Sequence, residues 1–295
     1  MKKNEKNPAK LHLTPPFNEK KQTPPGSEQQ MNEVPDHGEQ TYIGNHLFDG
    51  KTILITGGDS GIGKAIAIAF AREGADVAIS YLSSVEDKDA KDTKKWIEKA
   101  GQKCLLVKGD ITSSKHCKKI IDKTVAKFNK IDVLINNAAY QMQHKNLDSI
   151  TEEDWEHTFA TNVHALFYLT KYALPHIPVG GSIINTTSVN VYSPNPTLLP
   201  YAATKSAIQN ITASLSKMLL EQEKGIRVNA VAPGPIWTPL IPTTIKDYKN
   251  FGKNTPMGRP GQPAEIAPIY IFLASKAASY ISGAIVPATG GRITL

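Results

Sequence analysis

The sequence predicts a doubly wound α/β domain built on a seven-stranded parallel sheet, and three observations lead to this. Short apolar runs rich in Val and Ile recur along the chain, amphipathic stretches of helical length separate them, and a glycine-rich turn follows the first run. Nearly continuous apolar strands between helices are typical of a parallel sheet that helices cover on both faces. In chain order the runs are TILIT, DVAIS, CLLVKG, DVLINN, GSIINTTS, IRVNAVAP and AIVPAT.

The helices between these runs can be justified in the same order. The stretch GIGKAIAIAFAREGA continues from the glycine turn as an amphipathic helix, and in residues 86–103 lysines alternate with acids, as on a solvated helix face. Residues 200–215 begin with Pro200 and continue with alanines and spaced apolar residues, which is a typical helix start. In this architecture ligands bind beyond the C-terminal ends of the strands, so we expect the functional motifs at that edge.

From composition we expect two parts: a polar, proline-rich N-terminal extension, residues 1–40, and the folded α/β domain, residues 41–295, whose motifs are taken up below. The extension carries six prolines among Lys, Gln, Glu and Asn and has few apolar residues. By itself it cannot bury enough surface to offset the entropy of ordering, so alone we expect it to be disordered. Its LHLTPPF segment, residues 11–17, has the apolar content to dock against the folded body or a second subunit.

Composition narrows the class of partner. The net charge is +7, but 30 of the 34 basic residues are lysines spread among acids, and no basic cluster is interleaved with aromatics, so we expect no nucleic-acid partner. No apolar run approaches the roughly 18 residues of a membrane span, and the basic N-terminus has no apolar stretch behind it, so we expect no membrane partner and no secretory signal. Two cysteines without a C-x-x-C pair indicate a reducing, cytoplasmic setting, and the scattered histidines predict no metal site.

The glycine turn after the first strand has the chemistry of a phosphate cradle. Gly57, Gly61 and Gly63 have the spacing G-x-x-x-G-x-G between a strand and a helix. The first allows a sharp turn, the second lets the backbone approach a pyrophosphate, and the third lets the helix pack close to the sheet. The helix N-terminus then offers N–H groups and a positive dipole end to phosphate oxygens. This context favours dinucleotide binding over a merely structural turn.

At this point the sequence resembles a known family. T-G-x-x-x-G-x-G, residues 56–63, resembles the nucleotide-binding motif of the short-chain dehydrogenase/reductase family, which has a Rossmann fold. Further matches follow in family order: NNAA at residues 136–139, with Ala139 in place of glycine, then Asn162, Ser188, Tyr201 with Lys205, and PGPIWT at residues 233–238. The resemblance covers residue 48 to the C-terminus. It is strongest to bacterial members with an N-terminal extension, the general-stress-protein and glucose-dehydrogenase-like group.

Tyr201 and Lys205 stand four positions apart, on one face of a helix. A free tyrosine has a pKa near 10, and a neighbouring ammonium would lower it, making Tyr201 a general acid toward a carbonyl or a base toward an alcohol. The resemblance implies that Lys205 also holds the nicotinamide ribose and that Ser188 hydrogen-bonds the substrate oxygen. It implies that Asn162 holds a water linking Lys205 to solvent.

The sequence also allows a purely structural role for each of these residues. Tyr201 and Lys205 in isolation could form a surface pair, Ser188 could be one of several hydroxyls at a strand end, and Asn162 could be satisfied by backbone. Asp110 ends the third strand, where the family uses an acid to bind adenine, but it could equally be a plain strand-end acid. The cofactor-binding residues predicted from motif and resemblance are Gly57, Asp59, Ser60, Gly61, Ile62, Gly63, Tyr81, Leu82, Asp110, Ile111, Asn137, Ala138, Ala139, Tyr201, Lys205, Pro233, Gly234, Ile236 and Thr238.

The choice between NAD and NADP is open at the sequence level. After its second strand, an NAD-selecting dehydrogenase usually places an acid that binds the ribose 2′-hydroxyl. Here Tyr81 or Leu82 takes that place, and the next acid is Glu86. The arginine or lysine that would hold a 2′-phosphate is also missing, so we expect NAD or NADP.

The predicted function is that of an NAD(P)-dependent oxidoreductase acting on a small or medium carbonyl or secondary alcohol. Residues 239–260 are expected to cover the substrate, with a partly apolar, proline-shaped surface. The alternative is a nicotinamide-binding regulatory or scaffold protein without turnover, because fold alone does not imply function. The resemblance also implies a homotetramer built partly on the helix that carries Tyr201.

Overall fold

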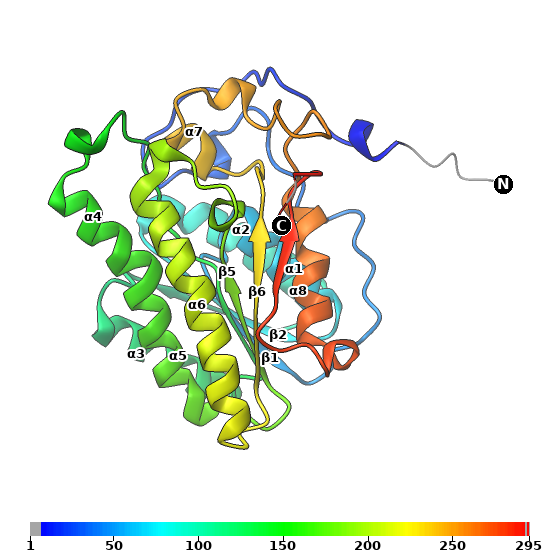
Figure 1. The fold of residues 1–295 in the computed structure, drawn as a ribbon. Coiled ribbons are helices and arrows are strands. Elements are labelled where there is room, and N and C mark those ends of the chain that lie inside the picture. Colours follow the sequence, from blue (N-terminus) through cyan, green and yellow to red (C-terminus); the bar gives the residue numbers. More distant parts are fainter. Residues whose placement is uncertain (1–6, 293, 295) are drawn as a thin grey trace.

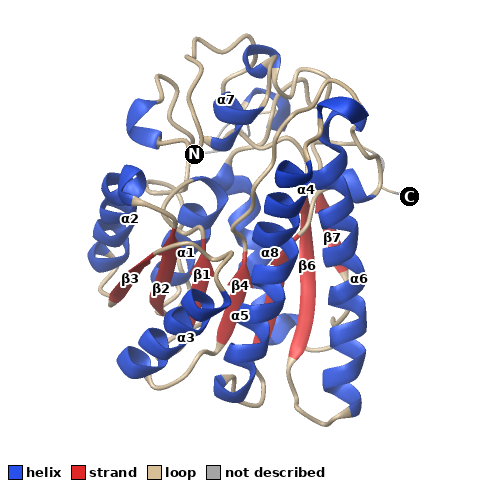
Figure 2. Cartoon of the chain, turned by 90° about the vertical axis from the view of Figure 1, so that its left-hand side faces the viewer, coloured by secondary structure: helices blue, strands red, loops and turns tan. Residues whose placement is uncertain are grey.

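The computed structural model describes residues 7–292 and 294, which form a sheet of seven parallel strands. The strands are β1 (Thr52–Thr56), β2 (Asp76–Tyr81), β3 (Cys104–Lys108), β4 (Val133–Asn136), β5 (Ser182–Thr186), β6 (Arg227–Pro233) and β7 (Ile285–Ala288). Their order across the sheet is β3-β2-β1-β4-β5-β6-β7, and Figure 2 shows them side by side. The predicted doubly wound α/β fold is confirmed, with a strand in each of the seven apolar runs.

Helices cover both faces of this sheet (Figure 1). They are α1 (Gly61–Arg72), α2 (Asp87–Lys99), α3 (Ser114–Phe128), α4 (Glu152–Phe159), α5 (Ala165–Ala173), α6 (Leu199–Glu221), α7 (Leu240–Thr244) and α8 (Pro263–Ala274). Side chains of α1, α2 and α8 pack in one hydrophobic cluster, and those of α3, α5 and α6 pack in another. In the described part of the chain, no helix combines the length and apolar character that a membrane crossing requires.

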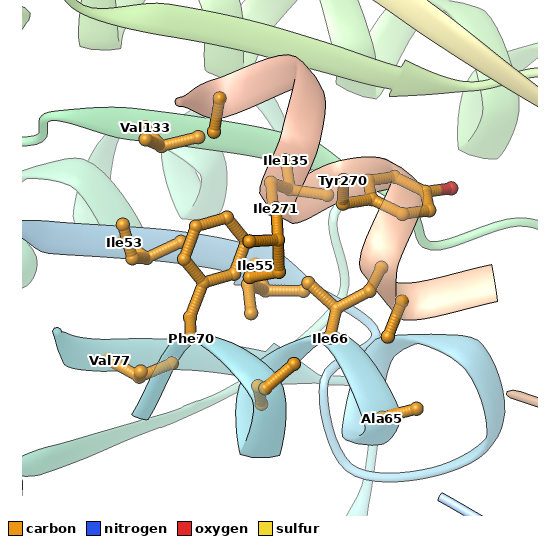
Figure 3. Close-up of a cluster of buried hydrophobic side chains, with 14 of the residues drawn as sticks. Ile53, Ile55, Ala65, Ile66, Phe70, Val77, Val133, Ile135, Tyr270 and Ile271 are labelled. Carbon is orange, nitrogen blue, oxygen red and sulfur yellow. The ribbon is translucent and has the colours of Figure 1, made fainter. Parts of the chain in front are cut away.

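The core follows directly from the two-residue period of a strand. Ile53 and Ile55 of β1 face the α1/α8 layer, where Figure 3 shows them beside Phe70 and Ile271, whereas Leu54 belongs to the cluster on the other face. All of these side chains are buried. In a strand that is buried on both faces, no side chain points to solvent. This is why TILIT is an unbroken apolar run with threonine only at its ends.

The sheet reverses its strand order at the centre. From β1 the chain winds outward through β2 to β3, and it then returns to place β4 on the other side of β1. All strands are parallel, so their C-terminal ends lie along one edge, and the loops leaving β1 and β4 diverge there. Such a divergence opens a crevice for a ligand.

The N-terminal extension lies against the body, as the blue segment beside α7 in Figure 1 shows. Phe17 stacks on Trp237 with ring centroids 4.0 Å apart, and its N–H donates to the carbonyl oxygen of Lys249 (2.8 Å). Trp237 Nε1 in turn donates to the carbonyl oxygen of Glu33 (2.7 Å). Phe17, the last residue of LHLTPPF, therefore docks on the body of its own chain. These contacts supply the burial that the extension lacks by itself.

Candidate active site

A cavity of about 430 Å³ lies at the C-terminal edge of the sheet. It extends from the ends of β1, β2 and β3, past the glycine turn, to α6 and the segment that carries α7. The predicted cofactor-binding residues that line it are Gly57, Asp59, Ser60, Gly61, Ile62, Tyr81, Leu82, Asp110, Ile111, Asn137, Ala138, Ala139, Tyr201, Lys205, Pro233 and Thr238. One cavity therefore collects residues that follow several different strands.

Three predicted cofactor-binding residues are not among those that line the cavity. A Cβ on Gly63 would lie 1.8 Å from the carbonyl oxygen of Gly57, so this glycine permits close packing of α1 against the turn. A Cβ on Gly234 would lie 2.8 Å from the Cα of Thr289, beyond the end of β7. Ile236 is buried, and its backbone pairs with that of Gly261. These three residues therefore pack behind the residues that line the cavity.

The glycine turn has the conformation that its spacing predicts. Gly57 and Gly61 have φ of 61° and 51°, in the left-handed region that favours glycine. The amides at the start of α1 are not all free, however, because the N–H of Gly61 donates to Glu28 Oε1 of the extension (2.8 Å). A carboxylate of the chain itself therefore uses one of the donors that the sequence assigned to phosphate.

Tyr201 and Lys205 lie on the first turns of α6, which begins at Leu199 with Pro200 in its first turn. Lys205 is 1% exposed, and its Nζ lies 5.3 Å from the centroid of the Tyr201 ring. The same Nζ donates to the carbonyl oxygen of Thr186 at the end of β5 (2.8 Å). The pair is therefore an internal one at the cavity wall, and the surface-pair reading is wrong.

The protonation of this pair differs from the sequence-based expectation. Burial raises the pKa of Tyr201 to about 12, and a hydrogen bond with Ser188 acts in the opposite sense. Burial also lowers the pKa of Lys205 to about 7. Lys205 therefore does not lower the pKa of Tyr201 in this structure, because desolvation favours the neutral form of both groups.

Ser188 and Asn162 lie close to this pair but do not line the main cavity. Ser188 Oγ accepts from the N–H and Nδ2 of Asn190 (3.2 and 3.1 Å). Asn162 lies in a single π-helical turn between α4 and α5, a feature common at functional sites. Its side chain exchanges hydrogen bonds with the backbone of Tyr140 (2.7 and 2.9 Å) and donates to Thr204 Oγ1 (3.0 Å). The Asn162 amide is thus hydrogen-bonded within the protein at both its nitrogen and its oxygen.

Comparison with known proteins identifies the family. A sequence model described as enoyl-(acyl carrier protein) reductase matches residues 57–292. The solved structure of a short-chain dehydrogenase from Burkholderia cenocepacia in complex with NADP matches this fold with a TM-score of 0.75 and 28% identity, over 83% of this chain and 98% of that one. The chain belongs to the short-chain dehydrogenase/reductase family.

Curated relatives of this short-chain dehydrogenase/reductase include bacterial and plant proteins. General stress protein 39 of Bacillus subtilis is 48% identical over 91% of this chain and 93% of its own. Glucose and ribitol dehydrogenase of Daucus carota is 45% identical over 93% and 96%. NADPH-dependent aldehyde reductase 1 of Arabidopsis thaliana is 44% identical over 93% and 97%. The resemblance to the general-stress-protein and glucose-dehydrogenase-like group is thus confirmed.

As a short-chain dehydrogenase/reductase, the protein is an NAD(P)-dependent oxidoreductase. Beside the NADP complex above, a 3-ketoacyl-(acyl-carrier-protein) reductase of Brucella melitensis complexed with NADH matches with a TM-score of 0.74 and 30% identity, over 83% of this chain and 99% of that one. The cavity fits a dinucleotide, because it runs from the end of β2 past backbone positions where a Cβ would clash and ends at Tyr201 and Lys205.

Several residues of this short-chain dehydrogenase/reductase line the cavity without having been predicted. Pro24, Pro25 and Gly26 reach it from the extension, and no local sequence signal could have placed them there. Glu86 reaches it from the turn before α2. The signal for Glu86 was present, because Ser83 and Glu86 have the S-x-x-E spacing of a capping box, which the structure forms. The further lining residues that were not predicted are Ser80, Gly109, Tyr140, His157, Thr161, Thr186 and Thr187. Pro239 and Leu240 also line the cavity, and they belong to the segment 239–260 that was expected to cover the substrate.

Proposed function

We propose that the protein transfers a hydride between NAD(P) and a small or medium carbonyl or secondary alcohol, with Tyr201 as the general acid/base. The observation that carries this is that Tyr201 and Lys205 line one end of a cavity that fits the dinucleotide, with Ser188 hydrogen-bonded to Tyr201 beside it. The names of the relatives, an aldehyde reductase and a glucose and ribitol dehydrogenase, support this class of substrate. No observation favours a regulatory or scaffold role.

Tyr201 donates its proton to the substrate oxygen during reduction and takes it back during oxidation. Its pKa of about 12 in this structure keeps the phenol protonated, which suits the acid role. A nicotinamide held in the cavity would supply or accept the hydride, and its oxidised form would bring a positive charge that favours the phenolate. Ser188 orients the substrate oxygen toward Tyr201.

Lys205 passes the proton onward. With a pKa of about 7, its amine can accept and release a proton near neutral pH. A small cavity adjoins it, lined among others by Thr161 and Asn162, and its free space of about 10 Å³ is close to the least that admits a single water. Thr161 Oγ1 and Asn136 Oδ1, which have no hydrogen-bond partner within the described part of the chain, offer polar contacts for it. We assign the relay water of the family to this position.

The test is a comparison of initial rates for wild type and Tyr201→Phe with NADH and NADPH, over a panel of aldehydes, ketones and sugars. We expect kcat to fall by a factor of about 10² to 10⁴ in Tyr201→Phe, because the proton donor is removed, while the nucleotide still binds through the rest of the cavity. Tyr280→Phe, at a fully exposed tyrosine, is the control and should keep full activity. Full activity in Tyr201→Phe would remove Tyr201 from the acid/base role.

We also propose that the enzyme is a cytoplasmic homotetramer. The family resemblance supports a tetramer assembled partly through α6. Exposed apolar side chains on α5 and α6 support it as well, namely Phe167, Met218 and Leu220, each about half exposed. The two cysteines, without a disulfide between them, support the reducing location.

A further inference from the structure

A chain of hydrogen bonds links Ser188 to the loop that leads into α6. Ser188 is 5% exposed, and its Oγ accepts from both the N–H (3.2 Å) and the Nδ2 (3.1 Å) of Asn190. Asn190 Oδ1 in turn accepts from the N–H of Asn195 (2.8 Å). A backbone N–H can only donate, so it requires the oxygen of the Asn190 amide as its partner. The Nδ2 group of Asn190 must therefore face Ser188.

These contacts fix the direction of the hydrogen bond between Ser188 and Tyr201. A serine hydroxyl has two acceptor lone pairs and one hydrogen to donate. The two nitrogen donors of Asn190 both point at Ser188 Oγ and use its two lone pairs, so only the hydrogen is left. Ser188 also forms a hydrogen bond with Tyr201. In that bond Ser188 is therefore the donor, and the Tyr201 oxygen is the acceptor.

The pKa of Tyr201 is consistent with this direction. Burial raises the pKa to about 12, and the hydrogen bond with Ser188 acts in the opposite sense. A bond donated to the tyrosine oxygen stabilises the phenolate and lowers the pKa, whereas a bond accepted from the phenol would raise it. Ser188 therefore does not hold the Tyr201 proton, which stays available for a substrate oxygen.

We propose that Asn190 is a positioning residue that keeps Ser188 a hydrogen-bond donor toward the reacting oxygen. A carbonyl oxygen in the site can accept from Ser188 and from Tyr201 at once. Hydride addition at the carbonyl carbon places negative charge on that oxygen, where Tyr201 gives up its proton and Ser188 keeps its own. A serine hydroxyl that is free to turn could instead accept from Tyr201 and withhold that proton. The inference rests on the proposed function, because Asn190 has this task only if Ser188 and Tyr201 act on a substrate oxygen.

Asn190→Asp tests the direction of the bond while keeping the shape of the side chain. One carboxylate oxygen can still accept from Asn195, but the other has no hydrogen, so Ser188 must donate to it and can only accept from Tyr201. Asn190→Ala removes the side-chain contact and leaves the Ser188 hydroxyl free to turn. We expect kcat to fall by a factor of about 10² in Asn190→Asp, as on loss of an oxyanion donor, and by about fivefold in Asn190→Ala.

The rates are measured as reduction of propanal, benzaldehyde and glyceraldehyde by the full-length protein with NADH and with NADPH. Nucleotide affinity, followed by tryptophan fluorescence, should be unchanged in both variants, because Asn190 does not line the main cavity. The matched control is Asn146→Asp, at an exposed asparagine whose Oδ1 accepts from the N–H of Ser149 (3.2 Å), as an aspartate also can. It should keep the wild-type kcat.

The decisive comparison is a double-mutant cycle with Ser188→Ala, assayed at high enzyme concentration. If Asn190 acts only through Ser188, Asn190→Asp should lower kcat no further once the serine hydroxyl is gone. A further fall in that background would mean that the new charge acts on Tyr201 directly, which overturns the inference. So would a smaller loss in Asn190→Asp than in Asn190→Ala, which is the order expected of a packing role, or wild-type kcat in both. In each of these cases the proposed function stands, whereas failure of wild type to reduce any of the aldehydes overturns that function and the inference with it.

Discussion

Lys205 shows how burial alone can set the chemistry of a side chain. A lysine on a solvated helix face would carry a charge at every physiological pH, but Lys205 is 1% exposed and has one carbonyl oxygen, that of Thr186, as its hydrogen-bond acceptor. Desolvation therefore lowers its pKa to about 7, close to the pH at which the enzyme must move protons. The same desolvation raises the pKa of Tyr201, so burial favours the neutral form of both side chains.

This burial predicts a pH dependence of stability at the residue scale. Between about pH 7 and the ordinary lysine pKa of 10.5, the unfolded chain holds a proton at Lys205 that the folded chain has released. The free energy of unfolding contributed by this group therefore rises with pH across that window. Urea unfolding of the apoprotein from pH 6.5 to 9.5 should show a flatter pH profile in Lys205→Met. Lys217→Met, at a lysine 78% exposed, should keep the wild-type profile, and parallel profiles for all three would contradict the assignment.

At the scale of elements, the extension is joined to α1 by a buried ionic cluster. The Glu28 carboxylate contacts His37 Nε2 (2.7 Å) and Lys64 Nζ (2.8 Å), and His37 Nδ1 contacts Glu39 (3.0 Å). Burial alone would lower the pKa of His37, but the two carboxylates raise it. For Glu28, burial opposes the effect of His37 and Lys64, which together lower its pKa. The extension is thus held by charges that are satisfied only when it is docked.

Glu28→Gln should therefore destabilise the protein strongly. The change leaves Lys64 and His37 buried without their shared carboxylate, and breaking a buried pair costs about 3 kcal/mol. Glu221→Gln, which removes the same charge from an exposed i,i+4 pair, should change the free energy of unfolding by no more than about 0.5 kcal/mol. Denaturant unfolding of wild type, Glu28→Gln and Glu221→Gln measures both changes in the free energy of unfolding. Equal stability of Glu28→Gln and wild type would mean that the extension is not held by this cluster.

At the scale of the whole molecule, the cavity lies where the strand order reverses, and different side chains line it on the two sides of that point. The ends of β1, β2 and β3 supply an acidic side, and the ends of β4 and β5 with α6 supply the polar side that carries Tyr201. The extension and the α7 segment close the space between them, where Gly26 lies so near the backbone of Pro239 that a Cβ would meet its oxygen at 2.5 Å. Residues of the N-terminal extension and of the α7 segment, which are far apart in the chain, therefore line the same cavity.

The assembly proposed for this molecule has its own prediction. Sedimentation should give a mass four times the 32.1 kDa of one chain. Phe167→Asp places a charge on the exposed apolar face of α5 and should lower that mass, because a buried interface does not tolerate an unpaired charge. Val179→Asp, at an exposed loop position between α5 and β5, is the control and should remain a tetramer. A monomeric mass for wild type would refute the tetramer.

The sequence by itself determined the fold, the seven strands, the glycine turn and the placement of Tyr201 and Lys205 on one helix, because each depends on residues near one another in the chain. Strand and helix periods, the need for glycine at Gly57 and Gly61, and motif order can all be read without knowing what packs against what. Tertiary structure alone decided that Glu28 uses an amide of the phosphate cradle, and that Pro24, Pro25 and Gly26 of the extension reach the cavity. It alone decided that burial sets the pKa values of Tyr201 and Lys205. The physical reason is that charge, solvation and close contact depend on neighbours far apart in the chain, which no local pattern specifies.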